Sequence, residues 1–111
     1  MKRFLLPLLA ALALPTAVSA YTVSQKYYAA QVSAASWCRM NKGWVTKEEG
    51  TIDLLKLLKK KRISIEIMKE KDVKLVASTI WSVLDEKCLI DKSKIPSGRS
   101  FESRMKNLLN N

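Results

Sequence analysis

Two cysteines restrict the fold of this chain more than any other feature of its sequence. Cys38 and Cys88 lie far apart, neither has a metal-ligating neighbour, and the chain contains no histidine. In an exported protein such a pair is expected to form one structural disulfide, whereas a redox-active pair usually needs closely spaced cysteines. Closing the loop between them stabilises a fold by about 4 kcal/mol on the chain-entropy model, a large part of a small domain's net stability. We therefore predict a Cys38–Cys88 disulfide.

The N-terminal segment has the pattern of a cleaved secretory signal peptide, residues 1–20. The two residues after the initiating methionine, Lys2 and Arg3, are basic, and residues 4–15 are apolar. Residues 18–20 are small, as signal peptidase requires. An uncleaved anchor is the alternative, but polar residues interrupt the second half, and a membrane span needs about 20 predominantly apolar residues. We predict export to the periplasm or secretion, with residues 21–111 forming a single small helical domain.

The longest helical pattern in the chain covers residues 73–88. At 100° per residue its apolar side chains fall on one side of a helix. They are Val73, Val76, Ala77, Ile80, Trp81, Val83, Leu84 and Cys88. Because this stripe needs a surface to pack against, we expect the rest of the chain to be arranged around it. The pattern predicts a helix that ends at Cys88.

An earlier helix is predicted over residues 22–39. Thr22 or Ser24 can cap it, and its alanines and serines provide a thin side that another helix can approach closely. Its bulky side chains are Tyr27, Tyr28 and Trp37. Aromatic side chains on a helix of this kind are expected to pack in the core and at its rim.

A second helix is predicted to begin at Thr46. Thr46 and Glu49 have the spacing of a capping box, and the helical pattern continues to about Lys61. Gly50 weakens the first turn by about 1 kcal/mol relative to alanine. The helix is therefore expected to fray at its start or to begin later, at Thr51.

Residues 43–49 resemble the second half of an EF-hand calcium loop and the helix that follows it. Gly43 corresponds to the turn and Glu49 to the closing acidic position. In this register the three early ligand positions are occupied by Cys38, Met40 and Lys42. None of these side chains is a hard oxygen donor, which calcium requires. We expect a helix–loop–helix shape without a metal.

Residues 62–71 allow two interpretations. Three isoleucines alternate with polar residues, which is typical of a strand, but one short strand has no visible partner in the chain. Alternatively, Ser64 caps a short helix and Asp72 caps the long helix that follows. We favour the helical interpretation, with a bend between the two helices.

The remaining segments complete an all-α fold. Residues 92–98 have the composition of a turn-rich linker, and residues 100–109 have the spacing of a short amphipathic helix. If the two cysteines lie at helix ends, the first and third helices run parallel and the second returns between them. We predict a small three- to four-helix up-down bundle with one disulfide between helix ends, after the signal peptide. Steeper crossings, as in paired EF-hands, also satisfy the cysteines.

The sequence contains no catalytic constellation. It has no glycine-rich phosphate loop and no zinc-ligand spacing, and its adjacent acidic pairs diverge when placed on a helix. Ser103 and Lys106 match the S-x-x-K pattern of serine enzymes, but the companion motifs are absent. We predict neither an enzyme nor a metal or cofactor site.

The densest charge lies at the end of the second predicted helix. Its cations are Lys56, Lys59, Lys60, Lys61 and Arg62. The helix dipole accounts for acids at the start of this helix and cations at its end. The net charge of +10, of which +8 remains without the two basic residues of the signal, favours attraction to an anionic partner. This cluster is a candidate site for anionic lipid, polysaccharide or nucleic acid, with affinity that falls steeply with salt.

The preferred hypothesis is a non-enzymatic interaction or structural module of the cell envelope or secreted fraction. Leu75, an apolar residue on the polar side of the helix over residues 73–88, is the candidate contact. We expect the partner to be another envelope or secreted protein. Such a contact predicts an exposed apolar patch and binding that tolerates salt. Binding of an anionic surface through the basic cluster is the alternative.

Overall fold

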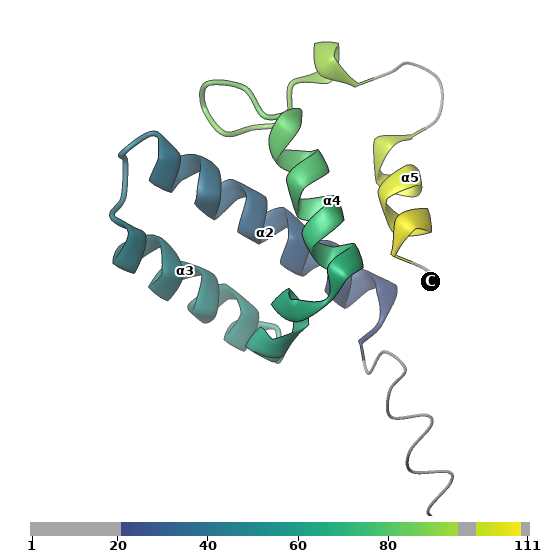
Figure 1. The fold of residues 1–111 in the computed structure, drawn as a ribbon, viewed down its shortest axis with the longest axis horizontal. Coiled ribbons are helices and arrows are strands. Elements are labelled where there is room, and N and C mark those ends of the chain that lie inside the picture. The colour runs from purple at the N-terminus through teal and green to yellow at the C-terminus, as the bar shows by residue number, and fades with distance from the viewer. Residues whose placement is uncertain (1–20, 96–99, 110–111) are drawn as a thin grey trace, which may run out of the picture.

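Four α-helices and two short 3-10 helices make up the regular structure of residues 21–95 and 100–109, which the computed structural model describes (Figure 1). In chain order they are α2 (Val23–Asn41), α3 (Lys47–Lys60), η1 (Ile65–Lys69), α4 (Lys71–Ser82), η2 (Lys92–Lys94) and α5 (Phe101–Leu108). Successive α-helices alternate in direction, and the described ranges contain no strand (Figure 1). The predicted all-α class is therefore confirmed. The predicted signal peptide lies outside the described residues.

Helix α2 is the central element of the fold, a place that the sequence analysis gave to the helix over residues 73–88. It packs against α3, η1, α4 and α5. Its buried side chains are mostly small, among them Ala29, Ala30, Ser33, Ala34 and Ser36. Small side chains let neighbouring helices approach the α2 backbone closely, so that α2 can pack against four other elements.

Capping residues set the starts of α2 and α3. Thr22, one of the two predicted candidates, is the N-cap of α2, and it forms a capping box with Gln25. At α3, the Glu49 amide donates to Thr46 Oγ1 at 3.0 Å, and the Thr46 amide donates to Glu49 Oε1 at 2.8 Å. The predicted capping box is confirmed, and α3 begins directly after it at Lys47. These bonds satisfy amide groups that the first helical turn otherwise leaves unpaired.

Gly50 allows α3 to lie close to α2. A Cβ atom at this position would lie 2.6 Å from Cγ of Met40, a distance that forces the methionine to move. Gly50 is buried within α3. The helix therefore does not begin later, at Thr51, which was one of the two outcomes expected from the glycine. The glycine that costs helix propensity therefore makes room for contact between the two helices.

Residues 62–71 form a helical turn and not a strand. Ser64 Oγ accepts a hydrogen bond from the Glu66 amide at 3.1 Å and caps η1, as the favoured interpretation predicted. The predicted cap at Asp72 is wrong, because α4 begins at Lys71 and its N-cap residue, Glu70, makes no side-chain cap bond. Asp72 instead lies in the first turn and accepts a hydrogen bond from Lys26 Nζ at 2.8 Å.

Helix α4 ends at Ser82, six residues before the predicted end at Cys88. In the loop that follows, Asp85 Oδ1 accepts hydrogen bonds from the amides of Lys87 and Leu89, at 2.8 and 3.1 Å, and these bonds take the place of a further helical turn. The chain then turns back, and Cys88 adopts a φ of 61°, which an α-helix cannot contain. The last part of the predicted stripe is therefore a loop.

The Cys38–Cys88 disulfide is present, with a Cα–Cα distance of 5.8 Å. It joins the last turns of α2 to the loop after α4, so only one of the two cysteines lies on a helix. The predicted bridge is confirmed, and the prediction that it joins two helix ends is corrected. The bridge holds the ends of α2 and α4 together, although the loop provides one of the sulfur atoms.

The core lies where α2 meets its neighbours. From α4 it contains Val73, Val76, Ala77 and Ile80, and from η1 it contains Ile67. Leu54 and Leu58 of α3 and Met105 and Leu109 at the end of α5 complete its sides. Helices α3 and α4 lie on either side of α2 and pack chiefly against it (Figure 1). Two shallow hollows remain along α2 between these neighbours.

Candidate functional site

Leu75, the predicted partner contact, is exposed on α4. Its relative exposure is 53%. The positions one turn before and after it are Lys71, Ser78 and Thr79, which are all polar. Leu75 is therefore a single apolar side chain on a polar helix face. Scattered apolar residues of this kind are common on protein surfaces.

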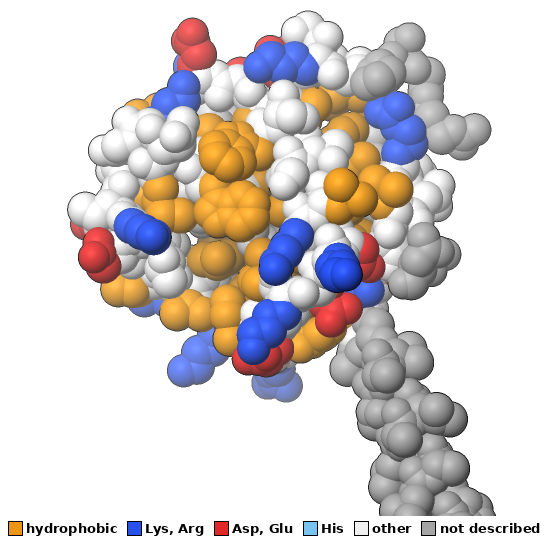
Figure 2. Space-filling view, in the orientation of Figure 1, with side chains coloured by type: hydrophobic (Ala, Val, Ile, Leu, Met, Phe, Trp, Pro, Cys, Tyr) orange, Lys and Arg blue, Asp and Glu red, His pale blue; other side chains and the backbone are white. Residues whose placement is uncertain are grey.

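A wider apolar surface lies between α3 and α4, over the C-terminal half of α2. Figure 2 shows hydrophobic side chains gathered at the centre of this face. A shallow hollow of about 380 Å³ is lined there by Trp37, Met40, Asn41, Lys47 and Trp81. The ring centroids of Trp37 and Trp81 lie 6.0 Å apart with the rings tilted by 52°. We call this surface, formed by these five residues, the tryptophan groove.

The groove is open because η1 covers only part of the α2 face between α3 and α4. At Ser33 the face is covered, since Met68 Sδ of η1 lies 3.1 Å from Ser33 Oγ. Trp37 lies one turn further along α2, and its side chain remains partly exposed. Trp81 is 39% exposed. The two indole rings thus shield each other and still present apolar area to solvent.

The charged side chain that lines the tryptophan groove is a cation, Lys47. On α4, Lys74 lies seven positions before Trp81, which places both on the same side of the helix two turns apart. Neither lysine forms an ion pair within the described ranges. The groove therefore combines an apolar centre with positive charge at its edges.

The five predicted cations remain together at the end of α3 and in the turn after it. All of them, Lys56, Lys59, Lys60, Lys61 and Arg62, are exposed. None forms an ion pair with another described residue. Lys61 Nζ lies 5.4 Å from the centroid of the Tyr28 ring, a cation–π distance. Arg62 has a φ of 60° and directly follows Lys61, the C-cap of α3.

The tryptophan groove was not predicted from the sequence. The helical patterns placed Trp37 in the core or at its rim, where it is partly buried, and they placed Trp81 in a buried stripe, which is wrong because Trp81 is 39% exposed. Their meeting depends on how α2 and α4 cross, which a helical pattern in one segment does not reveal. The usable signal is that Trp37 directly precedes Cys38, because a disulfide at Cys38 brings another segment against this part of α2.

No group of three or more histidine, cysteine, aspartate or glutamate side chains in residues 21–95 and 100–109 is placed to hold a metal ion. No described helix has the length and apolar character that crossing a membrane requires.

Comparison of the chain with protein-family models, with curated proteins and with solved structures finds no match.

Proposed function

We propose that this chain is an exported, non-enzymatic interaction module that binds another envelope or secreted protein through the tryptophan groove. Export is supported by the signal-like residues 1–20 and by the Cys38–Cys88 disulfide, which is typical of oxidising compartments. The single observation that carries the binding role is the exposed tryptophan pair. Tryptophan is enriched among the residues that dominate binding energy at protein interfaces.

The exposed area of Trp81 sets the expected energy. A tryptophan side chain buries about 150–250 Å² when fully covered, so an exposure of 39% leaves roughly 60–100 Å² for a partner to cover. At about 25 cal/mol per Å², this area is worth roughly 1.5–2.5 kcal/mol, or a tenfold to sixtyfold change in affinity. One side chain can therefore decide whether the partner is retained.

The partner segment that fits the groove is apolar and flanked by acidic residues. Its apolar side chains cover the two indole rings, and its carboxylates lie near Lys47 and Lys74. The net charge of +10 adds a long-range attraction that increases the rate of encounter with such a partner. Apolar contact gives an affinity that persists in salt, whereas the rim charges give a smaller, salt-sensitive part.

The test is affinity capture from the organism's own envelope and secreted fractions with the disulfide-intact protein. Three baits are compared at low and high salt: the wild type, Trp81→Ala and Leu75→Ala. We expect one protein to be retained through high salt by the wild type and by Leu75→Ala but lost by Trp81→Ala. A peptide of that protein containing an acid-flanked apolar segment should then compete for binding.

The Leu75→Ala bait is a matched control, because Leu75 is an exposed apolar residue on the same helix. Retention by Trp81→Ala together with loss by Leu75→Ala would move the contact to Leu75. Self-association that Trp81→Ala abolishes would make a second copy of the chain the occupant. In either case the acid-flanked partner segment would be rejected.

A second candidate function is binding of an anionic surface through Lys56, Lys59, Lys60, Lys61 and Arg62. The observation that favours it is the exposure of all five cations without ion pairs to described residues. Capture of many anionic species that disappears at high salt, and that is reduced by Lys59→Gln but not by Trp81→Ala, would support this function over the first.

A further inference from the structure

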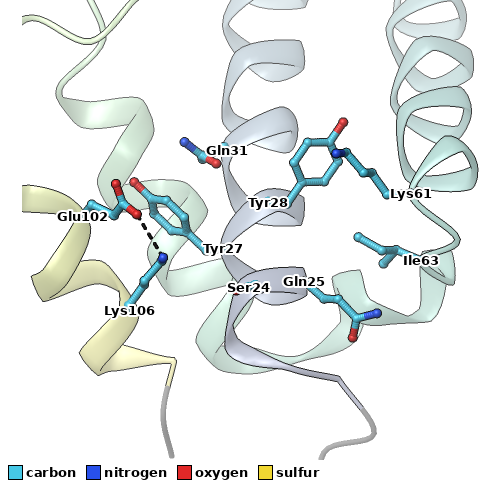
Figure 3. Close-up of a pocket in the computed structure, with 9 residues that line it drawn as sticks. All are labelled: Ser24, Gln25, Tyr27, Tyr28, Gln31, Lys61, Ile63, Glu102 and Lys106. Carbon is cyan, nitrogen blue, oxygen red and sulfur yellow. Dashed lines mark ion pairs between the residues drawn. The ribbon is translucent and has the colours of Figure 1, made fainter.

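A second hollow, of about 430 Å³, is lined by residues of α2, of α5 and of the segment at the end of α3 (Figure 3). Tyr28, which lines it, is nine positions from Trp37 and is therefore turned by about 180° around the helix axis. Ser24 and Gln31 of α2 form its floor, between α5 on one side and the end of α3 on the other. Its volume lies within the range of about 300–1,000 Å³ that is typical of small-molecule sites.

Each side of this hollow carries a tyrosine with a lysine over its ring. Lys106 Nζ lies 5.7 Å from the Tyr27 ring centroid, and Lys61 Nζ lies 5.4 Å from the Tyr28 ring centroid. The charge of Lys106 is neutralised by Glu102, whose Oε2 is 2.9 Å away. Lys61 has no acidic partner among the described residues. The available positive charge therefore lies on the α3 side.

The neutral polar groups of the hollow have bonding capacity to spare. The Ser24 hydroxyl, the Gln31 amide and the Tyr28 hydroxyl line it and form no hydrogen bond with another described residue. Gln25, in contrast, uses its side-chain oxygen in the capping box of α2. Hydroxyl and amide groups donate and accept hydrogen bonds, so together they suit a ligand with several hydroxyl groups.

The tyrosine rings do not provide a stacking platform for nucleic acid bases. Stacking on single-stranded nucleic acid needs an accessible aromatic face. Tyr27 is only 8% exposed, and the ammonium group of Lys61 lies over the ring of Tyr28. A ligand in this hollow is therefore recognised by hydrogen bonds to the hydroxyl and amide groups that line it and by charge, and not by stacking on the tyrosine rings.

We propose that this hollow binds one acidic sugar unit of a polysaccharide. Its hydroxyl groups exchange hydrogen bonds with Ser24, Gln31 and the Tyr28 hydroxyl, and its carboxylate pairs with Lys61. Arg62, directly after Lys61, extends the positive surface toward the next acidic unit of the chain. The proposal narrows the second candidate function to one class of ligand, rests on that function, and does not depend on the tryptophan groove.

The test is titration of the disulfide-intact protein with three probes: a short oligogalacturonate, a neutral oligosaccharide of the same length, and an oligothymidylate of the same charge. We expect the oligogalacturonate to bind best. Gln31→Ala and Lys61→Gln should each weaken its binding about tenfold or more, because each removes a bond that the ligand makes in the hollow. Trp81→Ala should leave it unchanged.

Lys56→Gln is the matched control for charge, since Lys56 is an exposed cation of α3 that does not line the hollow. Because Lys56 belongs to the basic cluster, Lys56→Gln should weaken binding about twofold through charge alone, well short of the tenfold loss expected for Lys61→Gln. Equal effects of Lys56→Gln and Lys61→Gln, with the oligothymidylate bound equally well, would show attraction by the basic cluster alone and would retain only the second candidate function. Absence of binding to the oligogalacturonate would overturn the proposal and the polysaccharide class together.

Discussion

Replacement of Asp72 by asparagine tests the ion pair that connects α4 to the start of α2. The Lys26 side chain is only 4% exposed, and its Nζ lies 2.8 Å from Oδ2 of Asp72 and 3.8 Å from Oε1 of Glu70. Asparagine keeps the shape of the side chain and the oxygen that accepts a hydrogen bond from the Val73 amide at 2.8 Å. The asparagine –NH2 group then replaces the oxygen that faces Lys26 Nζ, so the substitution removes the negative charge together with the acceptor of the Lys26 hydrogen bond.

The loss of one partner from a buried ion pair costs about 3–5 kcal/mol, because the other charge stays buried without compensation. Glu70 reduces this cost, since its carboxylate is already near Lys26. We expect Asp72→Asn to lower the free energy of unfolding by about 2–3 kcal/mol. For a domain of this size, the melting temperature should fall by about 10–20 °C. Thermal unfolding followed by circular dichroism, with the disulfide intact, measures both values.

Lys26→Met provides the control for this prediction. A buried methionine needs no counter-charge, so the double variant Lys26→Met/Asp72→Asn should be more stable than Asp72→Asn alone. A loss of less than about 0.5 kcal/mol in Asp72→Asn would refute the reasoning, because effects of that size are typical of ordinary surface substitutions. Failure of Lys26→Met to rescue Asp72→Asn would refute it as well.

Three further predictions concern stability. Replacing Cys38 by serine should lower the free energy of unfolding by about 4 kcal/mol, measured by urea unfolding against the oxidised wild type. Gly50→Ala should destabilise the wild type because of the clash with Met40, but should stabilise a Met40→Ala background by about 1 kcal/mol through helix propensity. Burial, with the nearby carboxylate of Glu102, raises the pKa of Tyr27 above 10.0, so stability should fall as the pH rises above about 10, and Tyr27→Phe should reduce that fall.

The parts of the fold that could be predicted are those fixed by bonds between near neighbours in the sequence. The caps at Thr22, Thr46 and Ser64 each depend on an amide two or three residues further on. Such bonds form whatever the tertiary arrangement is, so the sequence pattern is sufficient. The disulfide was also predictable, because the chain offers only two cysteines.

The end of α4 could not be predicted from apolar spacing. Val83 and Cys88 are buried, as the stripe indicated, but they reach the core from a loop. A buried loop residue must be apolar just as a buried helix residue must, so the pattern continues past the helix. Asp85 was the informative residue, because aspartate readily accepts hydrogen bonds from nearby backbone amides and so competes with the helix.

The thin side of alanines and serines on α2 was predicted, but not that four elements pack around this helix. Ser33 and Ser36 are almost fully buried, with exposures of 0% and 1%, although a polarity pattern assigns serine to the surface. Ser33 resolves the conflict by donating to the carbonyl oxygen of Ala29 at 2.7 Å, which satisfies the hydroxyl within its own helix. Residue size, and not hydrophobicity, made this helix the centre of the fold.

The disulfide connects the fold to the proposed binding surface. Trp37 directly precedes Cys38, and Trp81 lies at the end of α4, just before the loop that carries Cys88. The bridge therefore holds the two helix ends at the place where the indole rings meet. An apolar groove between two helices tends to close or to change shape unless the separation of its sides is fixed. The same bond that stabilises a domain of this small size thus also preorganises the groove, which reduces the cost of ordering it when a partner binds.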